Sequence, residues 1–268
     1  MFNRLRMMLI ITALTIMILP GAVFADSGLA VIDKSLLDKG IITVSYSKAK
    51  ETKAIVRITK DKVNYDYILV VGAQYPLQLG NGDYTIMVAE AVGGTKYKAI
   101  AQETVILNMQ KENDVFLQSM VQVDWNKKSK SVIKALELTK NAKTDKEKVT
   151  AIYTYITKNF KYDFDKAKTV KTGYIPILDD VFKASKGICY DYATTFAAMT
   201  RSLGIPTKLV MGYYAKNPTV YHAWNQVYLK DTNEWITVDS TNDAVQVQAG
   251  KATIMSKKTA EFKISKIY

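Results

Sequence analysis

The chain has 268 residues, of which 48% are hydrophobic and 23% charged, and its formal net charge is +12. This composition fits one large or two modest globular domains and excludes a wholly disordered chain. One cysteine excludes an intramolecular disulfide, one histidine with one cysteine is too few for a zinc cluster, and no spacing indicates a metal or cofactor site.

The N-terminal residues have the pattern of an export signal. Arg4 and Arg6 form a basic start, Met7–Leu19 is an uncharged apolar run, and Val23-Phe24-Ala25 resembles a cleavage site. A membrane anchor is the alternative, but the run is shorter than the roughly 20 residues that a spanning helix needs. We therefore predict a signal peptide over residues 1–25 and a secreted or cell-surface protein.

The positive charge is concentrated after residue 110. A basic exported domain can bind anionic surfaces such as cell walls or membranes. The alternative is an ordinary lysine-rich soluble surface, because the lysines are dispersed. No nucleic-acid-binding motif is present. Nothing in the sequence indicates the oligomeric state.

Residues 26–110 are predicted to form a small β-sandwich-like domain. Short runs rich in Val, Ile, Thr and Tyr alternate with turn residues such as Gly80-Asn81-Gly82-Asp83. The segment contains neither Cys nor His and no catalytic constellation. The expected strands are Ile41–Tyr46, Ala54–Thr59, Tyr65–Val71, Tyr84–Ala89 and Tyr97–Leu107.

Residues 111–268 are predicted to form a second domain that begins with helices. Thr144-Asp145-Lys146-Glu147 resembles a capping box. The apolar residues that follow have helical spacing and form one core-facing stripe: Val149, Ile152, Tyr153, Ile156 and Phe160. A long polar connection is expected over Lys161–Lys186.

Cys189 is predicted to lie at the N-terminus of a helix. Ala193, Phe196 and Leu203 form its apolar face, and Gly204 ends it. Exposed N–H groups and the helix dipole at this end favour a thiolate, which is the nucleophilic form of cysteine.

Three β-strands follow the cysteine helix: Thr207–Tyr214, Tyr221–Leu229 and Glu234–Asp239. An antiparallel hairpin centred between Lys230 and Asp231 would place His222 directly opposite Asp239 on one face of the sheet. A shift of one residue would separate them, so the pattern permits this pairing without requiring it.

Cys189, His222 and Asp239 supply the three groups that thiol catalysis needs: a nucleophile, a base and a residue that orients the base. The only Cys and the only His of the chain both belong to this set. Taken singly, each is more often a structural residue than a catalytic one.

Several motifs in the second domain resemble the transglutaminase-like superfamily. Gly187-Ile188-Cys189-Tyr190-Asp191-Tyr192-Ala193, followed by Arg201-Ser202-Leu203-Gly204-Ile205-Pro206, resembles its nucleophile segment. His222-Ala223-Trp224-Asn225-Gln226-Val227 resembles its histidine strand, and Trp235–Thr241 its aspartate strand. The similarity covers roughly Thr144–Asn242.

The resemblance implies an α+β fold with a papain-like transglutaminase core, in which a Cys helix packs on an antiparallel sheet. It also implies a Cys–His–Asp acyl transferase, peptidase or amidase that acts on a protein or peptide, for instance in the cell wall, through a thioester on Cys189. The Cys189 amide is a candidate oxyanion donor, and Tyr162 or Tyr174 could supply a second. The alternative is a non-catalytic surface-binding or scaffold protein that retains the fold.

Overall fold

The computed structural model describes residues 15–16, 28–48 and 52–268. The predicted signal peptide therefore lies outside the described residues, apart from Thr15–Ile16. Contacts within the chain divide it into two compact units, one ending at Val121 and the other running from Gln122 to Tyr268. Within the described part of the chain, no helix has the length and apolar character needed to span a membrane.

The first unit is built from strands, as predicted. Its larger sheet has the order β1-β8-β7-β4-β5, and its smaller sheet has the order β2-β3-β6. The strands are β1 (Thr15–Ile16), β2 (Ala30–Asp33), β3 (Ile41–Tyr46), β4 (Ala54–Lys60), β5 (Val63–Ile68), β6 (Gln74–Pro76), β7 (Gly82–Gly93) and β8 (Lys96–Leu107), with 3-10 turns at Leu37–Lys39 and Glu112–Leu117.

The two sheets of this unit pack against each other through buried side chains. The Tyr67 ring of β5 meets the Tyr75 ring of β6 edge-on, with centroids 5.6 Å apart. The Tyr84 hydroxyl of β7 donates to the carbonyl of Leu77, just after β6, over 3.0 Å. All four residues are almost fully buried, so the interior is shared by both sheets.

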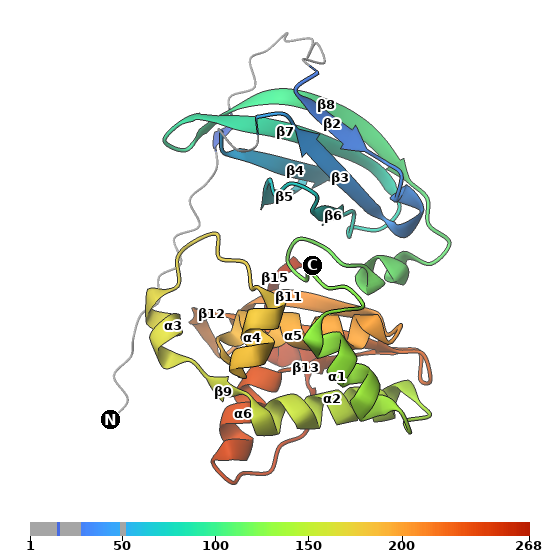
Figure 1. Ribbon diagram of the computed structural model, residues 1–268, viewed down its shortest axis with the longest axis vertical. Coiled ribbons are helices and arrows are strands. Elements are labelled where there is room, and N and C mark those ends of the chain that lie inside the picture. The colour runs from blue at the N-terminus through green and yellow to red at the C-terminus, as the bar shows by residue number, and fades with distance from the viewer. Residues whose placement is uncertain (1–14, 17–27, 49–51) are drawn as a thin grey trace. The chain divides into compact units, whose positions relative to one another are not determined.

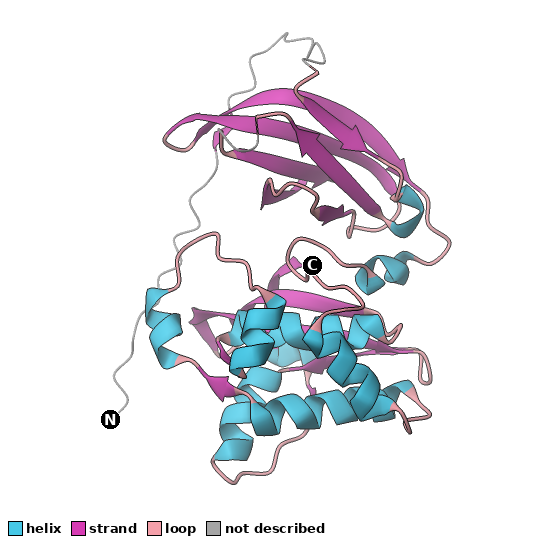
Figure 2. Ribbon diagram, in the orientation of Figure 1, coloured by secondary structure: helices cyan, strands magenta, loops and turns pink. Residues whose placement is uncertain are grey.

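The second unit combines helices with an antiparallel sheet, and Figure 2 shows most of the helices of the described chain gathered in it. Its sheet has the order β14-β13-β12-β11-β15. The elements are α1 (Lys130–Thr139), α2 (Asp145–Asn159), β9 (Lys161–Tyr162), α3 (Phe164–Thr169), α4 (Leu178–Ala184), β10 (Lys186–Gly187), α5 (Cys189–Ser202), β11 (Thr207–Tyr214), β12 (Asn217–Leu229), β13 (Glu234–Val238), α6 (Ser240–Gln248), β14 (Ser256–Lys257), a 3-10 turn (Thr259–Glu261) and β15 (Phe262–Ile267).

Helices α2, α5 and α6 share one hydrophobic core with the sheet. The predicted α2 stripe is buried and meets Phe196 of α5, Val227 of β12 and Ala244 of α6. The capping box at Thr144 is also present, since its side chain accepts from the Glu147 amide over 3.2 Å. The prediction of a cysteine helix packed on an antiparallel sheet is confirmed.

The segment Lys161–Lys186 is more ordered than the sequence indicated. The parallel two-residue strands β9 and β10 pair with each other, and α3 and α4 lie between them. These elements are too short to produce a readable hydrophobic period, so the sequence showed only a polar connection.

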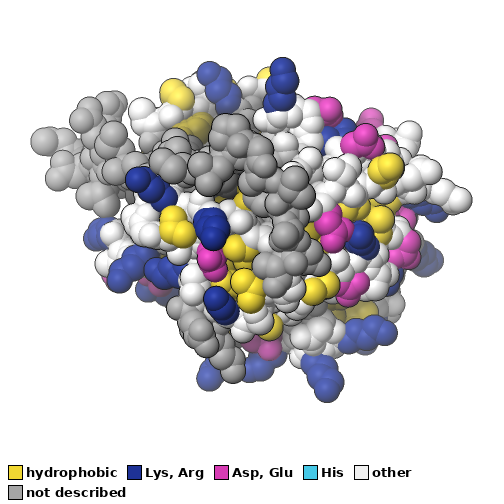
Figure 3. Space-filling model, turned by 90° about the horizontal axis from the view of Figure 1, so that it is seen from above, with side chains coloured by type: hydrophobic (Ala, Val, Ile, Leu, Met, Phe, Trp, Pro, Cys, Tyr) yellow, Lys and Arg dark blue, Asp and Glu magenta, His cyan; other side chains and the backbone are white. Residues whose placement is uncertain are grey.

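On the face shown in Figure 3, Lys and Arg side chains lie scattered among acidic and hydrophobic ones. No separate basic patch stands out on this face, and binding to an anionic surface stays a prediction.

Candidate active site

Cys189 is the first residue of α5, as its sequence position indicated. Ile188 precedes the helix in an extended conformation, and its amide donates to Asp191 Oδ2 over 2.8 Å. The first amides of a helix have no acceptor within it, so the thiol lies among partly positive N–H groups. The side chain is partly exposed, and it borders a cavity of about 260 Å³ together with His222.

His222 and Asp239 are brought together, but in a different register from the one predicted. β12 and β13 pair Asn225 with Val238, which centres the hairpin between Asp231 and Thr232 and makes Asp239 diagonal to His222. The shift is two residues, so the side chains keep the same face of the sheet. Asp239 also lies just beyond β13, where it caps α6.

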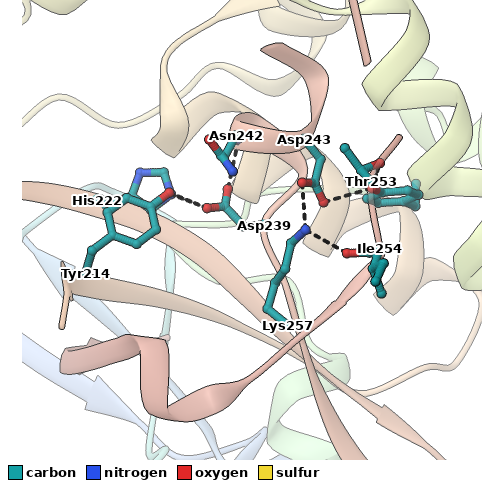
Figure 4. A network of polar contacts seen from close by, with 9 residues as sticks. Tyr214, His222, Asp239, Asn242, Asp243, Thr253, Ile254 and Lys257 are labelled. Atoms are coloured by element: carbon teal, nitrogen blue, oxygen red, sulfur yellow. Dashed lines mark hydrogen bonds and ion pairs between the residues drawn. The ribbon is translucent and has the colours of Figure 1, made fainter. Parts of the chain in front are cut away.

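The two carboxylate oxygens of Asp239 have separate partners (Figure 4). Oδ1 accepts from the Asn242 amide over 3.1 Å, the usual geometry of a helix N-cap. Oδ2 lies 2.9 Å from His222 Nε2 and accepts a short hydrogen bond from the Tyr214 hydroxyl. Because Nε2 faces the carboxylate, Nδ1 is the ring nitrogen left for the thiol.

The electrostatics of the site favour a protonated His222 imidazole. Burial alone would lower the pKa of His222, but the charge and hydrogen bond of Asp239, together with those of Cys189, raise it to about 10. Burial likewise opposes ionisation of Asp239, yet the His222 charge and the bonds from His222 and Tyr214 hold its pKa below the ordinary value. This arrangement can support a thiolate–imidazolium pair with a carboxylate behind it.

Tyr214 is a site residue that was not among the catalytic residues predicted from the sequence. Its ring stacks on the His222 ring with centroids 4.7 Å apart, and its hydroxyl lies 2.9 Å from His222 Nε2. The stack continues from His222 to Trp224 and on to Phe262. Tyr214 lies two residues from Gly212, which pairs with His222, and period-two alternation along β11 was the available signal.

Asp191, in the first turn of α5, also links this helix to α3 and to Tyr174. Its side chain is fully buried, and Lys166 forms an ion pair with Oδ2 over 2.7 Å. The Tyr174 hydroxyl donates to Oδ1 over 2.6 Å. The Tyr174 hydroxyl therefore already donates its hydrogen bond to a carboxylate. Tyr162 lies close enough to Cys189 for the thiolate charge, after the larger effect of burial, to help raise the pKa of Tyr162 to about 12.

A second buried acid lies one turn further along α6. Asp243 Oδ1 accepts from Lys257 Nζ over 2.7 Å, and Oδ2 from the Tyr153 hydroxyl over 2.8 Å (Figure 4). Burial, and to a smaller degree the Asp239 charge, raise the pKa of Asp243 despite the lysine. These contacts fix α6 to α2 and β14, and so hold the helix that Asp239 caps.

In the described residues, no group of three or more His, Cys, Asp or Glu side chains is arranged to hold a metal ion. The reactive groups that the site offers are a thiol, an imidazole, a carboxylate and a tyrosine hydroxyl.

Part of the chain that contains this site is similar to proteins of a known family. Residues 134–240 match the family model of the Transglutaminase-like superfamily, which confirms the resemblance for this segment. The human Kyphoscoliosis peptidase is 33% identical over 115 residues, a stretch that covers 39% of this chain and 17% of that protein. The uncharacterized protein YebA of Bacillus subtilis is 24% identical over 176 residues, covering 60% of this chain and 23% of YebA.

The chain thus spans about a fifth of the length of these two relatives. Among solved structures, a candidate cysteine protease from Cytophaga hutchinsonii aligns over 80% of this chain and 83% of its own, with 18% identity and a TM-score of 0.41.

Proposed function

We propose that the transglutaminase-like domain of this chain is a thiol enzyme that breaks amide bonds in proteins or peptides through a thioester on Cys189. One observation carries the proposal: a helix N-terminus, an imidazole and a capped carboxylate converge on the only thiol, beside a cavity. A scaffold that had lost catalysis would have no need of a buried His–Asp pair, which is costly to keep away from water.

The first step forms the thioester. The Cys189 thiolate attacks the amide carbonyl, and the C–N bond breaks as the His222 imidazolium gives its proton to the leaving amine. Asp239 holds Nε2, so that Nδ1 faces the thiol and the reacting bond. The tetrahedral oxyanion would be stabilised by the Cys189 amide, and Tyr162 fits the second donor better than Tyr174 does, because the Tyr174 hydroxyl is bonded to Asp191.

The second step consumes the thioester. His222, now neutral, removes a proton from water or from an amine, which attacks the thioester carbonyl and releases the acid or a new amide together with the thiol. We favour hydrolysis, because transfer to an amine needs a site that excludes water. That the human relative is named a peptidase agrees with this choice.

Mass spectrometry of the intact protein tests the proposal. The protein is incubated with an amide-substrate library and a primary amine, and adducts on Cys189 and the released products are identified. An acyl adduct with release of free acids supports hydrolysis, and isopeptide products support transfer. The Cys189→Ala variant is the control for non-specific adducts.

Iodoacetamide alkylation gives a test that needs no substrate, since Cys189 is the only thiol. The folded protein should react faster at neutral pH than its His222→Ala variant, because the imidazolium stabilises the thiolate. Asp239→Ala should slow the reaction less. Equal rates in the wild type and His222→Ala would refute the enzymatic proposal and favour the scaffold.

We also propose that the protein is exported. The basic start at Arg4 and Arg6, the short apolar run and the small residue Ala25 support a cleaved signal. N-terminal sequencing of the protein recovered outside the cell should begin at Asp26. A chain that still carries Met7–Leu19 would indicate an anchored protein instead.

A further inference from the structure

The cavity beside Cys189 has an apolar lining. Its walls include Tyr190 of α5, Met211 of β11, and Tyr221 and Ala223 of β12. The cavity volume of about 260 Å³ lies slightly below the range of about 300–1,000 Å³ that is typical of sites for whole small molecules. It exceeds the cavity of about 150 Å³ that suffices for benzene. The space therefore suits one side chain rather than a whole ligand.

The remaining wall is the segment 170–174, which follows α3. Tyr174 at its end donates to Asp191 over 2.6 Å, and Lys166 of α3 pairs with the same carboxylate. Tyr174 also meets the Tyr190 ring edge-on, with centroids 6.1 Å apart. Asp191 lies two residues after Cys189, so this hydrogen bond and ion pair attach the wall to the helix that carries the thiol. The cavity is therefore present before a substrate binds.

The charged groups at this cavity do not favour a charged substrate side chain. Asp191, the nearby carboxylate, is fully buried, and its oxygens are taken by Tyr174, Lys166 and the Ile188 amide. A cationic side chain would lose its hydration and would lie beside the His222 imidazolium, which already pairs with the Cys189 thiolate. An anionic side chain would lie beside the Cys189 thiolate, whose charge offsets that of the His222 imidazolium. The lysine of the lining, Lys171, is exposed to solvent, where an ion pair contributes little.

We propose that this cavity is a specificity pocket that binds one uncharged apolar side chain, aliphatic or aromatic, of the amide substrate. The inference rests on the proposed function, because the cavity selects substrates only if Cys189 reacts with them. It goes further by naming the class of substrate: amides that carry a Leu-, Met- or Phe-like side chain next to the bond that is cleaved.

The test uses thiol-alkylating iodoacetamides whose amide nitrogen carries a benzyl, isobutyl, carboxyethyl or aminoethyl group. The probes are compared by the second-order rate of Cys189 alkylation at low probe concentration, each normalised to the same reaction with free cysteine. Burial of the benzyl or isobutyl group should accelerate labelling between about 10- and 100-fold over the charged probes.

Met211→Trp fills the pocket and should remove this preference, so that the normalised rates with the benzyl and isobutyl probes fall to those of the charged probes. The control is Ile133→Trp on α1, an exposed aliphatic side chain outside the pocket, which should keep the preference.

Failure of the inference can be told apart from failure of the proposed function. If plain iodoacetamide reacts no faster with the wild type than with His222→Ala, the proposed function fails. If it does react faster but the normalised rates of all probes are equal, or a charged probe is preferred, the pocket proposal is overturned. An apolar preference that persists in Met211→Trp also overturns it, because recognition then lies elsewhere.

Discussion

The substitution Tyr214→Phe removes a single hydroxyl and keeps the ring that stacks on His222. The hydroxyl donates to the buried, ionised Asp239 and lies 2.9 Å from His222 Nε2. A hydrogen bond to a charged group contributes about 1.5–3 kcal/mol to stability. For a unit of this size, each kcal/mol corresponds to about 2–4 °C in melting temperature. We therefore expect the melting temperature to fall by about 3–12 °C.

The control for this change is Tyr213→Phe, the neighbouring residue on β11. The Tyr213 ring packs edge-on against Tyr221, and no described residue is hydrogen-bonded to its hydroxyl. Differential scanning fluorimetry at pH 7 compares both variants with the wild type. If Tyr214→Phe is as stable as Tyr213→Phe, the Tyr214–Asp239 bond does not stabilise the protein as argued.

The same bond predicts a pH dependence of the stability difference. The Tyr214 hydroxyl helps to hold the pKa of Asp239 below its ordinary value of 3.8. A carboxylate with a lowered pKa stabilises the fold above the pKa of the unfolded chain, and this contribution is lost as the pH falls through the folded-state value. The gap between wild type and Tyr214→Phe should be constant from pH 5 to 7 and shrink below about pH 3.8. A gap that widens in acid would contradict the assignment.

Three further changes probe the site and its support. Asp239→Asn should lower the His222 pKa from about 10, because the carboxylate charge is the main effect that raises it, and NMR can follow the single imidazole directly. Gly212→Ala should destabilise by about 3 kcal/mol or more, measured by urea unfolding, because its Cβ would lie 2.0 Å from the Lys263 carbonyl oxygen. Thr144→Ala should cost about 1 kcal/mol in the same assay through loss of the α2 cap.

Each of these changes has a reference. Gly250→Ala strains only the backbone, at φ +74° with no atom near the new Cβ, and should cost about 1–2 kcal/mol, less than Gly212→Ala. An Asp239→Asn protein whose imidazole titrates like the wild type would show that the carboxylate does not control His222. If Thr144→Ala has the same free energy of unfolding as the wild type, the Thr144 cap does not stabilise α2 as argued.

Local signals were sufficient for the helix that carries the thiol. Gly204, with φ +77°, ends α5 where the sequence indicated, and the apolar face of α2 follows its helical period. The strand Thr207–Tyr214 was predicted at its observed limits. These features depend on residues within one or two turns of each other, which a sequence displays directly.

Features that depend on pairing between distant residues could not be predicted from local sequence signals. The turn between β12 and β13 tolerates either centre, so the polar residues there could not fix the register. Helix α6 was missed because its first turn, Ser240-Thr241-Asn242-Asp243, is wholly polar. Asp239 could have indicated it, since aspartate is among the preferred N-cap residues.

One oxygen of Asp239 caps α6 and the other faces the His222 imidazole, so this residue has two roles that substitutions can separate. Asparagine caps helices about as well as aspartate does, but it bears no charge. Asp239→Asn should thus retain the start of α6 while leaving His222 without its counter-ion, whereas Asp239→Ala loses both. The difference in stability between these two variants measures the contribution of the helix cap. The loss of Cys189 reactivity that they share measures the contribution of the carboxylate charge. An active-site aspartate held only by its histidine would not allow that separation.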